Sequence, residues 1–213
     1  MEVGARGSAA RAPQSDALPP TNTGASLRRV AVLISGRGSN LQALLDAEQD
    51  AYKIVLVISN VPGVEGLERA QRVGVETLVV DHKRFGKDRE AFEREIDAAL
   101  RARQIDIVAL AGFMRVLTPF FVRAWSGRLV NIHPSLLPKY PGTKTHERAL
   151  EAGDKEHGAT VHLVVEEVDA GEILGQASMP IEAGDTPETL ARRVLALEHD
   201  LYPRCLEKLA RAL

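Results

Sequence analysis

The sequence has one cysteine, few aromatic residues and no long apolar run, and each shortage narrows what the protein can be. Cys205 has no second cysteine with which to form an internal disulfide, which is typical of a reducing compartment. With 4% aromatic residues, aliphatic side chains must supply the core. No apolar run reaches the roughly 18 residues that a membrane helix needs, and no apolar secretory segment begins the chain. We therefore expect a cytoplasmic protein with no membrane partner.

An excess of charge of one sign is also missing. The formal net charge is −2, and no run of lysine and arginine with interleaved aromatic residues occurs, so we expect no nucleic-acid partner. Hydrophobic residues make up 45% and charged residues 26% of the sequence, which is the balance of an ordinary globular protein. Its length of 213 residues suits one sizeable core. We expect a single domain over residues 27–213.

Residues 1–26 differ in composition from the rest of the chain. They are dominated by Ala, Gly, Arg, Pro, Ser and Thr and hold almost nothing large and apolar that could pack against a core. We predict a disordered N-terminal extension. A transit peptide is the alternative, but Glu2, Asp16 and the Pro19-Pro20 pair weaken it, since such peptides are poor in acidic residues.

From Arg29 onward, apolar runs of strand length alternate with segments of helical period. This alternation is typical of βαβ units. The predicted fold class is α/β, with an open, mostly parallel twisted sheet and helices on both faces, as in Rossmann-like folds. The predicted strands are 30–34, 53–59, 76–80, 105–110, 128–132, 159–165 and 173–179. The predicted helices are 66–73, 88–103, one capped by residue 118 and ending near 125, 146–152, and two that begin near 40 and near 187.

A glycine-rich loop, residues 36–40, follows the first predicted strand and leads into a helix. Glycines let backbone N–H groups approach a phosphate, and Ser39 and Asn40 can donate from their side chains. The loop does not match the dinucleotide fingerprint, because Leu41 stands where the third glycine belongs. It also lacks the Gly-Lys-Ser/Thr of a P-loop. A small phosphorylated substrate fits this loop, and a tight turn without a ligand is the alternative.

Two polar side chains emerge together at the end of the fifth predicted strand. In an extended strand Asn131 and His133 point to one face and Ile132 to the other. Pro134 biases His133 towards an extended backbone. An amide beside an imidazole can stabilise the oxyanion of an acyl transfer, with the histidine donating or moving a proton. No nucleophilic side chain is needed if the substrate brings its own amine.

The remaining titratable candidates give weaker signals. Asp169 falls in a loop between two predicted strands, where an Asx turn is the alternative to a place beside His133. The spacing of the other histidines does not form a zinc motif, so we expect no protein-bound metal and treat them as surface or structural residues. These histidines are His82, His146, His157, His162 and His199.

Four segments carry a resemblance to a known family, namely residues 36–42, 111–117, 131–142 and 166–171. Together they closely resemble the folate-dependent phosphoribosylglycinamide formyltransferases, over about Arg29 to Leu213. The Pro-rich segment 131–142 is the most specific of the four. Arg37 in the glycine loop and Glu172 after Gly171 depart from the residues common in the family.

The resemblance implies a catalytic trio and two binding sites. The trio is Asn131, His133 and Asp169. The resemblance implies that the substrate phosphate is bound by Gly38, Ser39 and Asn40. It also implies that the ribonucleotide part of the substrate is contacted by Glu198. The residues implied to form the folate site are Arg89, Met114, Arg115, Val116, Leu117, Asn131, Glu166, Glu167 and Val168.

The resemblance also implies the reaction. The formyl group of the co-substrate 10-formyltetrahydrofolate passes to the amine of 5-phosphoribosylglycinamide in de novo purine biosynthesis, by direct attack through a tetrahedral intermediate. Methionyl-tRNA formyltransferases carry a further C-terminal domain, for which we expect no room. A formyltetrahydrofolate deformylase and a non-catalytic module that binds a phosphorylated ligand remain the alternatives. A homodimer is left open.

Overall fold

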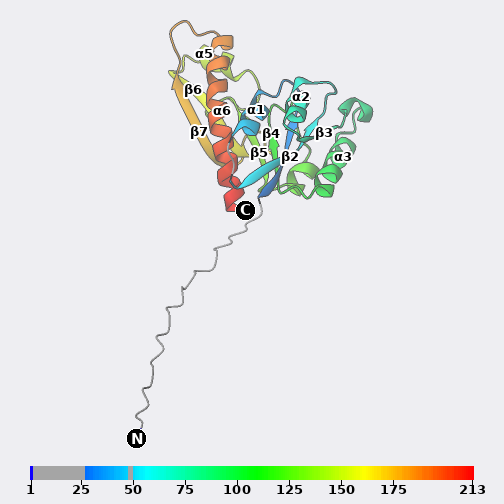
Figure 1. Ribbon diagram of the computed structural model, residues 1–213. Helices are drawn as coiled ribbons and strands as arrows, with labels where there is room; N and C mark the ends of the chain where they lie inside the picture. Colours follow the sequence, from blue (N-terminus) through cyan, green and yellow to red (C-terminus); the bar gives the residue numbers. More distant parts are fainter. Residues whose placement is uncertain (2–26, 48–49) are drawn as a thin grey trace.

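The computed structural model describes Met1 and residues 27–47 and 50–213, so the disorder predicted for residues 1–26 lies, apart from Met1, outside the described residues. Seven strands form one sheet in the order β3-β2-β1-β4-β5-β6-β7 (Figure 1). The strands are β1 (Arg28–Ile34), β2 (Tyr52–Ser59), β3 (Glu76–Val79), β4 (Ile107–Leu110), β5 (Leu129–His133), β6 (Glu156–Leu163) and β7 (Ile173–Pro180).

The sheet is mostly parallel, as predicted. The pairs β2–β3, β1–β2, β1–β4 and β4–β5 are parallel, whereas β5–β6 and β6–β7 are antiparallel. In β1, Val30 to Ile34 are fully buried, which explains why this strand is continuously apolar: helices cover it on both faces. The order of the strands reverses between β1 and β4, and the crevice beside such a switch is where open α/β sheets bind ligands.

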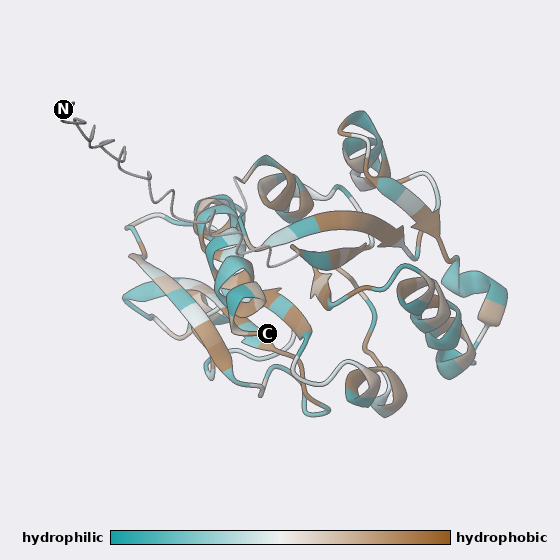
Figure 2. Cartoon of the chain, turned by 60° about the horizontal axis from the view of Figure 1, so that its bottom comes forward, coloured by the Kyte–Doolittle hydropathy of each residue, from teal (hydrophilic) through white to brown (hydrophobic). Residues whose placement is uncertain are grey.

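Helices cover both faces of the sheet. The helices are α1 (Ser39–Asp46), α2 (Glu65–Arg72), α3 (Arg89–Ala102), α4 (Pro119–Ala124), α5 (Thr145–Glu151) and α6 (Pro187–Ala212). Apolar residues of α1, α2 and α6 share one hydrophobic cluster, and those of α3 and α4 share the cluster on the other face. Figure 1 shows α6 lying across the end of the sheet formed by β6 and β7. Figure 2 shows hydrophobic residues along the central strands and hydrophilic residues on the surrounding helices.

The structure differs most from the sequence prediction at two places. A short 3-10 helix, η1 (His82–Phe85), was not predicted; the Asp81 carboxylate accepts a hydrogen bond from the Lys83 backbone N–H and begins it. Strand β6 starts at Glu156 and ends at Leu163, whereas the prediction was 159–165. Its polar first residues gave no apolar signal, but they pair with the end of β7, so cross-strand hydrogen bonds extend the strand.

Two further features are the position of the single cysteine and whether any helix could cross a membrane. Cys205 is buried on α6 within the apolar cluster, where it packs as a small apolar residue. Within residues 27–47 and 50–213, none of the helices combines the length and the apolar character needed to cross a bilayer.

Candidate active site

The loops that follow β1, β4 and β5 meet at one edge of the sheet. A hollow of about 240 Å³ lies between the loop after β1 and the loop after β4, lined by Ser35, Gly36, Arg37, Gly38, Ser39, Asn40, Ala111, Gly112 and Met114. A second hollow, of about 170 Å³, lies between the loops after β4 and β6 and the end of β5. The segment 110–117 contributes residues to both hollows, so the two lie on either side of it.

The glycine-rich loop, residues 36–40, which is the predicted phosphate site, is held close to the N-terminus of α2. Gly38 caps α1 in a left-handed conformation, with φ of 72°, which favours glycine. The Gly66 backbone N–H donates to the Gly36 carbonyl at 3.2 Å, and Arg69 Nε donates to the Arg37 carbonyl at 2.9 Å. The first N–H groups of α1 have no partner within their helix, so this rigid loop presents donors to the first hollow.

Replacing Gly66 with alanine is expected to disturb this loop selectively. An added Cβ would lie 2.5 Å from Ile34 Cδ1 and 2.9 Å from the Gly36 carbonyl oxygen, so the loop backbone must move. We expect the KM of the phosphorylated substrate to rise about tenfold, which corresponds to about 1.4 kcal/mol. Steady-state kinetics measures this, with Glu68→Ala on the exposed face of α2 as the control. An unchanged KM in the Gly66 variant would show that the loop is not a phosphate site.

Glu198 of α6 reaches the same loop from a distant part of the sequence. Asn40 Nδ2 donates to Glu198 Oε2 at 2.6 Å, although the two residues are 158 positions apart. Burial raises the pKa of Glu198, and the hydrogen bond from Asn40 opposes that rise. The predicted substrate residues Gly38, Ser39, Asn40 and Glu198 therefore lie together. Their role in binding stays a prediction.

The predicted catalytic trio is also brought together. His133 ends β5, and its Nδ1 lies 3.5 Å from Asp169 Oδ2. His133 Nε2 donates to the Tyr140 carbonyl at 2.9 Å. In this conformation the imidazole is held under the Pro-rich loop that follows β5, residues 134–142, and does not line either hollow. Asn131, two residues earlier, lines the second hollow.

Asp169 binds partners far along the chain instead of forming an Asx turn with its neighbours. Its Oδ2 accepts from the Gly142 backbone N–H at 2.8 Å, and its Oδ1 lies 3.5 Å from His162 Nε2. Burial by itself raises the pKa of Asp169. The Gly142 N–H and the His133 imidazole oppose the effect of burial, and the pKa of Asp169 lies below its usual range. The carboxylate is therefore charged at neutral pH, between two histidines.

His162 is the residue of this site that sequence reasoning missed. It is buried, it pairs with Asn131 across β5 and β6, and its Nε2 lies 3.3 Å from Asn131 Nδ2. It lines the second hollow with Asn131 and Asp169. The signal that could have revealed it is the pairing of β5 with β6, because residues on the same face of two paired strands are neighbours. That pairing requires the register, which the sequence pattern does not give.

The predicted folate residues divide between lining and supporting positions. Those that line the second hollow are Arg115, Val116, Leu117, Asn131, Glu166 and Val168. Met114 lines the first hollow, and its backbone N–H donates to Ser35 Oγ at 2.8 Å. Arg89 does not line the second hollow but donates to the Val116 carbonyl at 2.8 Å, which holds the loop after β4. Glu167 is exposed outside both hollows.

Two more histidines lie behind the Pro-rich loop. His146 Nδ1 and His157 Nε2 are 3.1 Å apart, and His157 is 1% exposed. Burial, followed by repulsion from His146, lowers the pKa of His157 to about 4, while Asp154 opposes the shift. The folded protein therefore holds His157 neutral at a pH where the unfolded chain would bind a proton.

This pair predicts a loss of stability in acid. Since the pKa of His157 is lower in the folded state than in the unfolded chain, its effect on folding is absent above about pH 6.5. The free energy of unfolding should fall as the pH drops from there towards 4, because the unfolded state takes up the proton first. Urea denaturation at pH 7.5 and pH 5 measures this in the wild type and in His157→Gln. Equal pH dependence in the two proteins would contradict the assignment.

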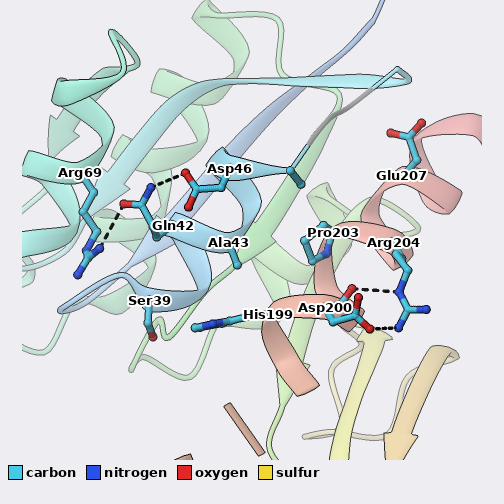
Figure 3. A pocket seen from close by; sticks show the side chains of 11 residues that line it. Ser39, Gln42, Ala43, Asp46, Arg69, His199, Asp200, Pro203, Arg204 and Glu207 are labelled. Carbon is cyan, nitrogen blue, oxygen red and sulfur yellow. Dashed lines mark hydrogen bonds and ion pairs between the residues drawn. The ribbon is translucent and has the colours of Figure 1, made fainter. Parts of the chain in front are cut away.

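A third hollow, of about 770 Å³, lies between α1 and α6. Figure 3 shows Gln42 between Arg69 and Asp46, and Arg204 against Asp200. Among its charged side chains, Asp200 and Arg204 pair with each other, while Arg69 and Glu207 pair with residues outside its lining, Glu65 and Arg211. Ser39 lines both this hollow and the first, so the start of α1 separates the two. Across the described ranges, His, Cys, Asp and Glu side chains nowhere gather into a group of three or more able to hold a metal ion.

Comparison with known proteins adds the following. Residues 28–206 match the family model described as formyl transferase. The phosphoribosylglycinamide formyltransferase of Escherichia coli is 48% identical over 82% of this chain and 83% of its own length. The trifunctional purine biosynthetic protein adenosine-3 of Drosophila melanogaster is 54% identical over 85% of this chain, which spans 14% of that protein.

Solved structures show the same fold. The phosphoribosylglycinamide formyltransferase of Coxiella burnetii, in complex with CHES, superposes with a TM-score of 0.83 at 46% identity, covering 88% of this chain and 89% of that one. The phosphoribosylglycinamide formyltransferase of Brucella melitensis has a TM-score of 0.82 at 47% identity, covering 88% and 98%. At these identities the likeness extends beyond the fold to the sequence.

Proposed function

Because the chain belongs to the formyl transferase family, we propose that it transfers the formyl group of 10-formyltetrahydrofolate to the amine of 5-phosphoribosylglycinamide, a step of purine biosynthesis. The observation that carries this proposal is the pair of adjoining hollows. One is bordered by the glycine loop and the other by Asn131, His162 and Asp169. A transferase needs such an arrangement, because fixing two substrates together supplies about 7–11 kcal/mol of the barrier.

The glycine loop supports a phosphorylated substrate. Backbone N–H groups at the start of α1 and the Ser39 side chain supply donors without a net charge. Glu198, held by Asn40, supplies a carboxyl group that can accept from ribose hydroxyls. The folate would occupy the second hollow, against Val116, Leu117 and the backbone of the loop after β4.

The chemistry would proceed by direct attack. The substrate amine forms a bond to the formyl carbon, and the electron pair of the C=O bond moves to its oxygen. Asn131 Nδ2 and the His133 imidazole donate to that oxygen. To do so, His133 Nε2 gives up its hydrogen bond to the Tyr140 carbonyl and donates to the substrate oxygen instead. Asp169 holds His133 as the cation. Collapse then breaks the bond between the formyl carbon and the folate nitrogen, which takes up the proton lost by the amine.

Tetrahydrofolate release tests the proposal. Purified protein with 10-formyltetrahydrofolate should release tetrahydrofolate when phosphoribosylglycinamide is added, and should not do so with the dephosphorylated ribonucleoside. Release with water alone would identify a deformylase and overturn the proposal. Binding of the phosphorylated substrate without any release would leave only a binding module. We also propose a cytoplasmic location, since the single cysteine suits a reducing compartment.

A further inference from the structure

We propose that His162 is a positioning residue that acts through Asn131. As a neutral imidazole with its proton on Nδ1, it accepts a hydrogen bond from the Asn131 amide nitrogen and fixes that nitrogen towards the second hollow. The role deepens the proposed function and rests on it, because Asn131 is the predicted donor to the reacting oxygen. The inference starts from one distance, 3.3 Å between Asn131 Nδ2 and His162 Nε2.

The protonation of His162 Nδ1 follows from its partner. Nδ1 lies 2.9 Å from the Leu163 carbonyl oxygen, which can only accept, so Nδ1 carries a proton. Nε2 then faces two groups that make opposite demands. Asn131 Nδ2 offers a hydrogen and requires a lone pair, while Asp169 Oδ1, at 3.5 Å, requires a proton.

The charges of the cluster determine whether His162 Nε2 carries a proton. His133, His162 and Asp169 are all largely buried, and one carboxylate can offset the charge of one imidazolium. Both nitrogens of His133 face acceptors, namely the Tyr140 carbonyl and Asp169 Oδ2, so His133 takes the positive charge. His162 faces a donor at Nε2 and remains neutral. Asp169 keeps the Gly142 N–H and the His133 imidazole as partners in this arrangement.

The neutral state of His162 determines which atom Asn131 presents to the substrate. The amide nitrogen carries two hydrogens; one is bound by His162, which leaves the other for an oxygen in the hollow that both side chains line. A protonated His162 would repel that nitrogen and attract the amide oxygen. The amide would then turn, and its carbonyl oxygen would repel the negative charge that develops on the formyl oxygen.

Kinetics of a double-mutant cycle tests the coupling. His162→Leu should lower kcat by about 10- to 100-fold, which is less than the roughly 100- to 1,000-fold loss of kcat when an oxyanion donor is removed altogether. The KM of both substrates should stay within about twofold of the wild-type values. In the Asn131→Ala background the same change should cost less than about threefold, because no amide remains to be positioned. Full losses in both backgrounds would overturn the proposal. His162→Gln, whose amide oxygen can also accept, should recover part of the turnover and serves if the leucine variant does not fold.

The tautomer is tested separately by nitrogen NMR of the substrate-free protein with labelled histidine, using His162→Gln to assign the signal. At pH 7.5 we expect a protonated Nδ1 and an unprotonated Nε2. Protons on both nitrogens, or on Nε2 alone, would overturn the proposal. This measurement needs no turnover, so a protein inactive with both substrates would contradict the proposed function without deciding the tautomer.

Discussion

Replacing Asp169 with asparagine is expected to lower turnover by about 100- to 1,000-fold while the fold is retained. The asparagine oxygen can still accept from the Gly142 N–H, so the loop keeps its anchor. What is lost is the negative charge 3.5 Å from His133 Nδ1, on which the proposed mechanism relies to favour and orient the imidazolium. Steady-state turnover and a thermal melt of the same sample measure the two effects.

The matched control is Glu172→Gln, which removes a carboxylate at an exposed position at the end of the same loop. It should leave turnover within about twofold, because an exposed charge in water contributes little to a site that it does not contact. If Asp169→Asn kept turnover within threefold of the wild type, Asp169 would have no part in the chemistry.

Replacing Gly171 with alanine is expected to cause the second large effect. An added Cβ would lie 1.8 Å from the Leu163 carbonyl oxygen, where no atom fits, so the loop that carries Asp169 must separate from the end of β6. The separation breaks the hydrogen bond from the Leu163 N–H to the Glu172 carbonyl. It also withdraws Asp169 from His133 and His162. We expect turnover to fall at least tenfold, and the free energy of unfolding by about 1–3 kcal/mol.

Gly184→Ala is the control for this variant. Gly184 has φ of 89° and no neighbour within 4 Å of an added Cβ, so alanine there strains the backbone without a clash. We expect a stability loss of about 1 kcal/mol and unchanged turnover. Equal turnover in the Gly171 and Gly184 variants, measured with saturating substrates, would show that the loop does not hold Asp169 in place.

Much of the fold is visible in the sequence because buried parallel strands are continuously apolar. Val30 to Ile34 show this pattern, and the prediction placed that strand within two residues of its observed start. The polar start of β6 shows no such pattern, because backbone pairing with β7 and not side-chain burial fixes it. The 3-10 helix at His82–Phe85 depends on one side-chain cap, which is a local signal too weak to outweigh the surrounding loop.

The site was predictable to the extent that it is local in sequence. Asn131 and His133 share one strand, so the period of that strand places them together. Asp169 was assigned through the family resemblance, and its distance from His133 became known only from the structure. His162 required the register of β5 against β6. Glu198 approaches Asn40 only because α6 packs against α1, a contact between distant segments that no local pattern encodes.

The destination of the formyl carbon tests the central claim most directly. The protein is given 10-formyltetrahydrofolate labelled with ¹³C in the formyl group, together with phosphoribosylglycinamide, and the products are separated and analysed by mass spectrometry. We predict that the label appears in the ribonucleotide, one formyl group for each tetrahydrofolate released. Label recovered as formate, with the ribonucleotide unchanged, would contradict the account.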